Sequence, residues 1–289
     1  MTAVQAQEKL VQSGDAQLAT VARGEPKKGT ISLAMGATAS MLWWPEALVQ
    51  GVIDGGYQVI IFDHRDTGHS TTRPPGDVSY DLSDLAGDLM AILDAYGIRQ
   101  AHLAGMSLGG YLAQINALRH PERVLSLTLI ASEPFGISYE AEGIDDDFMA
   151  HFATMASLDW TNSEAVAAYL LRIAELSAGS RSPFDRSEAL ERIKGELSRT
   201  SSMQSAFNHS MVEGSIDLQQ TAAHLSCPVL LIHGSNDPII SITAAHMAKQ
   251  VIPRSELMIL EGVGHELLSQ DAPAIAQRIV AHCSANLPT

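Results

Sequence analysis

The feature that most constrains the fold of this chain is the alternation of short apolar runs with longer amphipathic patterns. Short runs that are apolar throughout are typical of strands buried on both faces of a parallel sheet. Between two of them, Leu82–Tyr96 carries apolar residues at helical spacing, with Asp81 placed to cap its start and Gly97 to end it. The alternation therefore predicts an α/β fold, in which helices flank a mostly parallel sheet of eight strands. The predicted strands are Lys9–Val11 and Gln17–Val21, paired as a hairpin, followed by Thr30–Ala34, Tyr57–Phe62, His102–Gly105, Leu125–Ala131, Val229–His233 and Glu256–Leu260.

One stretch, from about residue 135 to 215, interrupts this alternation. It contains no convincing strand and carries helical patterns at Ser163–Leu176 and Ser187–Leu197. We interpret residues 135–215 as a helical cap inserted into a core made of residues 1–134 and 216–289. Its Met and Phe side chains either line a substrate pocket or pack the insertion's own small core. They are Met149, Phe152, Met155, Met203, Phe207 and Met211.

Composition and charge exclude several classes of partner. The 289 residues are 46% hydrophobic and 18% charged, as in folded enzymes rather than disordered chains. A formal net charge of -15 repels nucleic-acid phosphates and anionic membranes, and no basic patch offsets it. The opening MTAVQAQEKL does not have the pattern of a secretory signal, and no apolar run approaches the roughly 18 residues of a membrane span. We therefore expect a cytoplasmic protein that binds neither nucleic acid nor membrane, and the oligomeric state stays open.

The strongest local signal is the pentapeptide GMSLG at 105–109, which follows a predicted strand and precedes the helical pattern Leu108–Arg119. A strand that turns sharply into a helix holds the central serine in a strained conformation, and the flanking glycines let neighbouring backbone approach. The serine also lies at a helix N-terminus, where free N–H groups favour negative charge. A tight turn without chemistry would use the same residue types, but the context favours Ser107 as a nucleophile.

A serine attacks a carbonyl only when a base takes its proton, and His265 is the best placed of the 11 histidines. It lies in GVGHE at 262–266, directly after the last predicted strand, and so emerges at the carboxyl edge of the sheet, where sites form in such folds. His233 ends another strand and could reach the same edge, but the glycine turn after it suits a supporting role. His69, in a loop, is the other histidine that the sequence does not dismiss.

The imidazole in turn needs an acceptor that holds its tautomer and stabilises its protonated form. Asp237, in GSNDP at 234–238, follows the predicted strand Val229–His233 at that same edge. An ordinary turn aspartate before proline would have the same local sequence. With Asp237, the chain order is serine, aspartate, histidine, which differs from the orders in the two familiar serine protease families. We therefore predict a triad of Ser107, Asp237 and His265.

Acyl transfer also requires N–H donors that bind the developing oxyanion. One is the backbone N–H of Leu108, next to the nucleophile. The second should come from the loop after the first parallel strand, MGA at 35–37, where we expect the N–H of Ala37. The chemistry implies no metal ion and no organic cofactor. The predicted substrate contacts, each of which could instead pack the interior, are Met35, Trp44, Met106, Met149, Phe152 and Phe207.

Over most of its length the chain resembles the α/β-hydrolases, whose members share the serine, aspartate, histidine order. The likeness is carried by GMSLG at 105–109, GSNDP at 234–238, GVGH at 262–265 and a fourth segment, DHRDTGHS at 63–70. The resemblance implies the α/β-hydrolase fold, with a helical cap over the site.

Two departures narrow the resemblance. Many relatives carry a glycine where this sequence has Asp66, and a histidine before Gly36 where it has Met35. Both features resemble the aclacinomycin methylesterase group, whose members remove a methyl ester from an anthracycline polyketide. Without the histidine before Gly36, the oxyanion loop must be supported differently from the commoner pattern.

These residues predict a serine hydrolase that cleaves a carboxylic ester, with a methyl ester among the options, through an acyl-enzyme. Its partner would be a small to mid-sized, largely apolar ester held between cap and core. Lactone hydrolysis, perhydrolysis and C–C bond cleavage use the same triad and stay open as alternatives. A catalytically silent binding protein on the same fold is a further alternative, against which the presence of all three triad residues argues.

Overall fold

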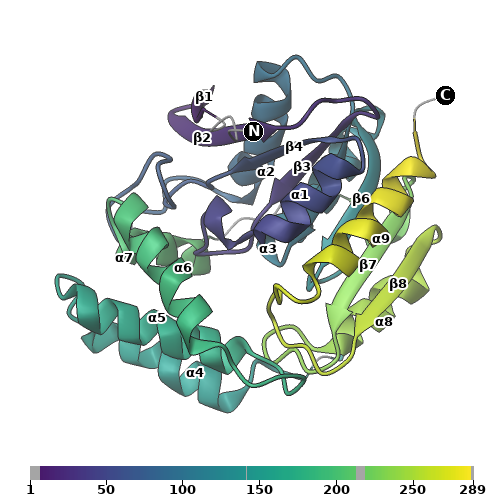
Figure 1. The fold of residues 1–289 in the computed structure, drawn as a ribbon. Helices are drawn as coiled ribbons and strands as arrows, with labels where there is room; N and C mark the ends of the chain where they lie inside the picture. The colour runs from purple at the N-terminus through teal and green to yellow at the C-terminus, as the bar shows by residue number, and fades with distance from the viewer. Residues whose placement is uncertain (1–6, 141, 213–218, 288–289) are drawn as a thin grey trace.

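A single eight-stranded sheet organises the computed structural model, which describes residues 7–140, 142–212 and 219–287. In spatial order its strands are β1 (Lys9–Ser13), β2 (Ala16–Arg23), β4 (Gln58–Phe62), β3 (Thr30–Ala34), β5 (Ala101–Met106), β6 (Val124–Ile130), β7 (Val229–Gly234) and β8 (Ser255–Leu260) (Figure 1). β2 runs antiparallel to both β1 and β4, and the other neighbouring pairs are parallel. This confirms the predicted fold class.

Helices cover both faces of the sheet because its central strands are buried on both sides. The helices around the sheet are α1 (Glu46–Asp54), α2 (Leu82–Ala95), α3 (Leu108–Arg119), α8 (Ile242–Val251) and α9 (Ala272–Ser284). Every residue of β3, β5 and β7 is buried. One face packs against α2, α3 and α8, with Leu89 and Ile115 in that layer, and the other packs against α1 and α9, with Leu48 and Ile279. No helix within the described ranges is both long and apolar enough to cross a bilayer.

Between β6 and β7 the chain leaves the sheet and forms a helical insertion. It consists of α4 (Asp146–Ala153), η3 (Thr154–Ser157), α5 (Ser163–Ser177), α6 (Arg186–Arg199), α7 (Met203–Ala206) and η4 (Phe207–Met211), where η marks a 3₁₀ helix. In Figure 1 these helices, coloured teal to green, lie together beyond one end of the sheet. They share an apolar core of their own that includes Tyr169, Ile193 and Phe207. The predicted boundary at residues 215 and 216 lies outside the described residues, so the division into core and cap stays a prediction.

Candidate active site

Ser107 lies at the sharp turn between β5 and α3, with φ 50° and ψ -119°. A side chain rarely adopts such a positive φ, so the surrounding backbone must hold the turn. The Ser107 N–H donates to Ile130 O at 2.9 Å, which ties the turn to β6. A Cβ on Gly105 would lie 2.2 Å from the Gly109 carbonyl carbon, and one on Gly109 would lie 2.1 Å from a carbonyl oxygen of β3. Both flanking positions therefore require glycine, and together they let the turn hold Ser107 at the carboxyl edge of the sheet.

Asp237 and His265 come from the loops after β7 and β8 and form one pair. His265 Nδ1 lies 2.8 Å from Asp237 Oδ2. The Asp237 side chain is fully buried, and its other oxygen, Oδ1, accepts hydrogen bonds from the Ile239 N–H at 2.9 Å and the Ile240 N–H at 2.8 Å. These two backbone bonds fix the carboxylate with Oδ2 toward the imidazole. With its Nδ1 donating to Asp237, His265 keeps Nε2 free to accept a proton.

The two alternative histidines lie elsewhere. His233 Nε2 donates to Ile240 O at 2.7 Å and lies 3.5 Å from Asp237 Oδ2, so its ring packs behind the loop that carries the aspartate. Burial lowers the pKa of His233, which keeps the ring neutral. His69 is half exposed, contacts Glu8 and does not line the cavity described below.

The loop that carries His265 is paired along its backbone with the linker between α5 and α6. The His265 N–H donates to Ser177 O at 2.8 Å, and a second backbone hydrogen bond of 2.9 Å joins the far ends of the two segments. Between these bonds the chains nearly touch, since a Cβ on Gly264 would lie 2.1 Å from Ser177 O. We call these paired segments, residues 177–181 and 262–265, the base–linker seam. It fixes the backbone from which the imidazole projects.

The loop after β3 lies against Ser107. A Cβ on Gly36 would lie 3.3 Å from Ser107 Cβ, and Ala37 lines the same cavity as the serine. Leu108 follows the serine as the first residue of α3, where backbone N–H groups have no acceptor within the helix. The structure thus brings both predicted oxyanion donors, Ala37 and Leu108, beside Ser107.

A cavity of about 330 Å³ extends between the carboxyl edge of the sheet and the helical insertion. Both Ser107 and His265 line it, and most of its wall is apolar. Asp237 lies behind His265 rather than in the wall. The predicted substrate contacts that line the cavity are Met35, Met106, Phe152 and Phe207.

The prediction was wrong for two substrate contacts, which do not line this cavity. Trp44 is buried in the layer between the sheet and α1, and its neighbour Trp43 lines the cavity instead. Met149 is 46% exposed on the outer side of α4, whereas Phe148 faces the cavity. Consecutive helical side chains point about 100° apart, so closeness in sequence does not decide which of two neighbours faces a site.

Sequence analysis also missed the polar side chains of α6 that line the cavity, Glu188, Arg192 and Glu196. The polar residues of an amphipathic helix are ordinarily assigned to solvent, and nothing local in the sequence marks these as different. Burial raises the pKa of Glu196.

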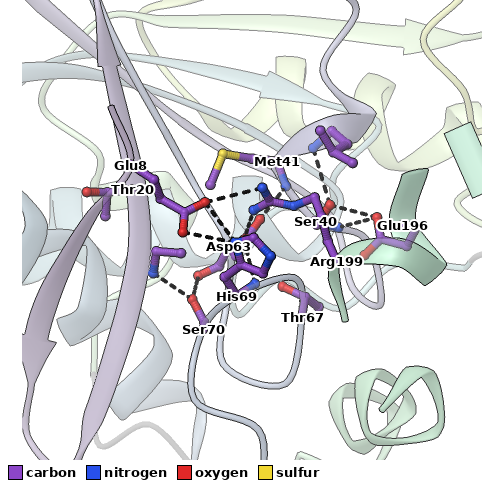
Figure 2. A network of polar contacts seen from close by, with 12 residues as sticks. Glu8, Thr20, Ser40, Met41, Asp63, Thr67, His69, Ser70, Glu196 and Arg199 are labelled. Carbon is purple, nitrogen blue, oxygen red and sulfur yellow. Dashed lines mark hydrogen bonds and ion pairs between the residues drawn. The ribbon is translucent and has the colours of Figure 1, made fainter. Parts of the chain in front are cut away.

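Two side chains near the C-terminal end of α6 tie this wall of the cavity to the core, as Figure 2 shows. Arg199 donates to Asp63 Oδ2 at 2.5 Å, and the Asp63 side chain is fully buried. Asp63 Oδ1 also accepts from the Met41 N–H at 2.8 Å. Glu196 Oε2 accepts from Ser40 Oγ at 2.6 Å. The buried ends of these contacts belong to the core, so α6 is anchored on its inner side.

The Arg199→Ala substitution is expected to lower the free energy of unfolding by about 3 kcal/mol, because the buried Asp63 carboxylate loses its cation. Urea unfolding at neutral pH measures the loss. Arg172→Ala on α5 is the matched control, since the Arg172–Glu175 pair is exposed and worth less than about 1 kcal/mol. Equal losses in the two variants would contradict the importance of the buried pair.

The potential metal ligands and thiols do not form a second centre in the part of the chain that the structure describes. There, no three His, Cys, Asp or Glu side chains are grouped so as to hold a metal ion. Cys227 and Cys283 are free thiols, and burial raises their pKa values to about 11 and about 12. Both thiols are therefore inert packing groups.

Comparisons with known proteins agree on one fold and one broad activity. A family model described as the alpha/beta hydrolase fold matches residues 33–272. The rhodomycin D methylesterase DnrP of Streptomyces peucetius is 26% identical over 277 residues, which cover 91% of this chain and 93% of that protein. A pimeloyl-[acyl-carrier protein] methyl ester esterase of Aeromonas hydrophila is 30% identical over 211 residues, covering 72% of this chain and 78% of that protein. The crystal structure of bromoperoxidase from Bacillus anthracis aligns with a TM-score of 0.78 at 18% identity, covering 96% of this chain and 99% of that one, and this likeness concerns the fold alone.

Proposed function

Because the chain belongs to the alpha/beta hydrolase fold family, we propose that it is a serine hydrolase that cleaves a carboxylic ester through an acyl-enzyme. One observation carries the proposal: Ser107 and His265 line one cavity, and the Asp237 carboxylate lies 2.8 Å from the far side of the imidazole. The esterase relatives support the same reaction class.

In this reaction Ser107 Oγ forms a bond to the ester carbonyl carbon while His265 Nε2 takes the hydroxyl proton. The carbonyl oxygen becomes an oxyanion, which accepts hydrogen bonds from the backbone N–H groups of Ala37 and Leu108. Each such donor lowers the barrier by about 3–4 kcal/mol. The tetrahedral adduct then breaks its bond to the alcohol oxygen, and His265 gives that oxygen its proton. A water molecule, deprotonated by the same imidazole, attacks the acyl-enzyme and releases the acid and Ser107.

Asp237 acts without changing its own protonation. Its Oδ2 accepts from His265 Nδ1, which keeps the proton-free nitrogen facing the serine and stabilises the imidazolium when it forms. The two backbone donors to Oδ1 prevent the carboxylate from rotating. The burial of this carboxylate strengthens its interaction with the imidazolium, because little water screens the pair.

The cavity favours a small to mid-sized, largely apolar ester. Its volume of about 330 Å³ lies at the lower end of pockets that enclose drug-sized ligands. Aromatic side chains such as Phe148, Phe152 and Phe207 form part of the wall opposite the sheet. Two of the relatives are named as methyl ester hydrolases, which supports a methyl ester as the group removed.

The test is active-site labelling combined with an ester series. A fluorophosphonate is expected to add to the protein once, and peptide mass mapping should place the adduct on Ser107, because only an activated serine displaces fluoride. Hydrolysis of p-nitrophenyl esters should fall once the acyl chain exceeds the length that the cavity accommodates. His265→Ala is the control and should resist labelling. Ester hydrolysis with the label on another residue, or with none, would contradict the proposed nucleophile.

A further inference from the structure

Two buried histidines hold the two ends of the segment that carries the Ala37 N–H. At its start, His64 Nε2 donates to Met35 O at 2.9 Å. At its end, the Thr38 N–H donates to His209 Nδ1 at 3.0 Å. The Met35 carbonyl belongs to the peptide plane before the one that carries the Ala37 N–H, and the Thr38 N–H belongs to the plane after it. The histidines therefore fix the backbone on both sides of this donor.

The contacts of His209 allow one protonation state. A backbone N–H can only donate and a carbonyl can only accept, so Nδ1 is unprotonated toward Thr38 and Nε2 donates its proton to Arg65 O at 2.7 Å. Burial lowers the pKa of His209 to about 3, and the nearby His64 ring lowers it further. The ring therefore keeps this neutral form under the conditions in which an esterase works.

Thr38 needs such a partner because its backbone is strained. Its φ of 67° lies in the left-handed region, which a β-branched residue rarely adopts. An acceptor aimed at the Thr38 N–H favours this conformation over the extended ones that a free loop would prefer. If that acceptor were lost, the loop could relax and the Ala37 N–H would turn away from the reacting carbonyl.

The support comes from the end of the helical insertion, 171 residues along the chain from Thr38. His209 lies in η4, and the residue before it is anchored in turn: Asn208 Nδ2 donates to Asp66 Oδ2 at 3.0 Å, and Asn208 Oδ1 accepts from the Gly76 N–H at 2.8 Å. Asp66 also has a left-handed φ of 67°, which is the conformation that a glycine would adopt without strain. Its carboxylate thus gives this loop an anchor for η4 that glycine would not provide.

We propose that His209 is a positioning residue for the oxyanion hole, which holds Thr38 and thereby aims the Ala37 N–H at the reacting carbonyl. The proposal rests on the serine-esterase reaction proposed above. It also accounts for the absence of a histidine before Gly36, because the loop receives its imidazole from η4 instead.

The test compares two amide variants that each keep one half of the ring's contacts. In His209→Asn the side-chain oxygen lies the same number of bonds from the backbone as Nδ1, so it can still accept from the Thr38 N–H. In His209→Gln the amide N–H takes the position of Nε2 and keeps only the contact to Arg65 O. We expect kcat for a p-nitrophenyl ester to fall about 10–100-fold in His209→Gln, with KM nearly unchanged, and to be largely retained in His209→Asn.

A second measurement reports on the oxyanion itself. A trifluoromethyl ketone shaped like the ester accepts Ser107 Oγ at its carbonyl carbon and forms a hemiketal whose oxygen occupies the hole. Its affinity should fall in His209→Gln by about the same factor as kcat and should be retained in His209→Asn. A merely structural role for His209 would not produce this parallel.

The matched control is His102→Asn. His102 is buried in β5, bonds through Nδ1 to Ser126 Oγ at 2.8 Å and does not line the cavity, so its loss should affect stability but neither kcat nor ketone affinity. Equal kcat in folded His209→Asn and His209→Gln, or a kcat loss with unchanged ketone affinity, would overturn the proposal. If the Gln variant does not fold, His209→Ala replaces it in the comparison. Full activity of Ser107→Ala would instead remove the proposed reaction, so the two failures are distinguishable.

Discussion

The Ser107→Ala substitution is expected to lower kcat/KM for ester hydrolysis about 10⁴–10⁶-fold. Alanine removes the oxygen that forms the acyl-enzyme but leaves the cavity and the backbone donors of the oxyanion hole in place, which accounts for the residual rate. Stability should hardly change, because the positive φ and the Ser107 N–H bond to Ile130 O do not depend on the hydroxyl. Steady-state kinetics with the best p-nitrophenyl ester, and thermal unfolding of both proteins, measure the two effects.

Two further variants make this result specific. His265→Ala should cost about as much as Ser107→Ala, and combining the two should cost little more, because triad members act as a unit. Ser210→Ala is the matched control, since Ser210 is another serine of the cavity wall and should be dispensable. Loss of activity in Ser210→Ala with retention in Ser107→Ala would assign the nucleophile to the wrong serine.

The Asp237→Asn substitution is expected to lower kcat about 10⁴-fold, although the side chain keeps its size and shape. Oδ1 accepts two backbone N–H bonds, so the amide oxygen of asparagine must take that position. The amide NH₂ then faces His265 Nδ1, which can only accept from it. The imidazole proton is forced onto Nε2, where it blocks acceptance of the serine proton.

The prediction separates orientation from charge. Asp185→Asn is the matched control, because Asp185 is a carboxylate of the cavity wall that caps α6 and takes no part in the proposed proton transfer. It should retain most of the activity in the same kinetic assay. A near-normal rate in folded Asp237→Asn would mean that another acceptor holds His265 Nδ1, and the proposed triad would then be incorrect.

The features that could be predicted from sequence are those with strong local causes. The sheet was predictable because β3, β5 and β7 are buried on both faces and so are apolar throughout. The turn at Ser107 was predictable because the close approach of backbone at Gly105 and Gly109 leaves room for no other residue. Asp237 and His265 follow adjacent parallel strands, and their meeting at 2.8 Å follows from that topology.

Features that depend on side-chain direction or on distant contacts were not predictable. α1 was not identified, since it begins after Pro45 without a side-chain cap and contains Gly51, whose position is set by packing against α9. The choice between Trp43 and Trp44 depends on how the chain enters that helix. The contact between Thr38 and His209 joins segments 171 residues apart, and no local pattern announces such a pairing.

The base–linker seam has a consequence for how the substrate range of such an enzyme can change. Gly179 and Gly264 each face a carbonyl oxygen of the opposite segment, at 2.1 Å from where a Cβ would be. A foreign insertion grafted between β6 and β7 would therefore have to bring a linker that matches the His265 loop, or it would displace the imidazole. In chimeras the two segments should be exchanged together, as one cassette. New specificity is more readily acquired by point changes on the inner faces of α4 and α6, which reshape the cavity and leave the seam intact.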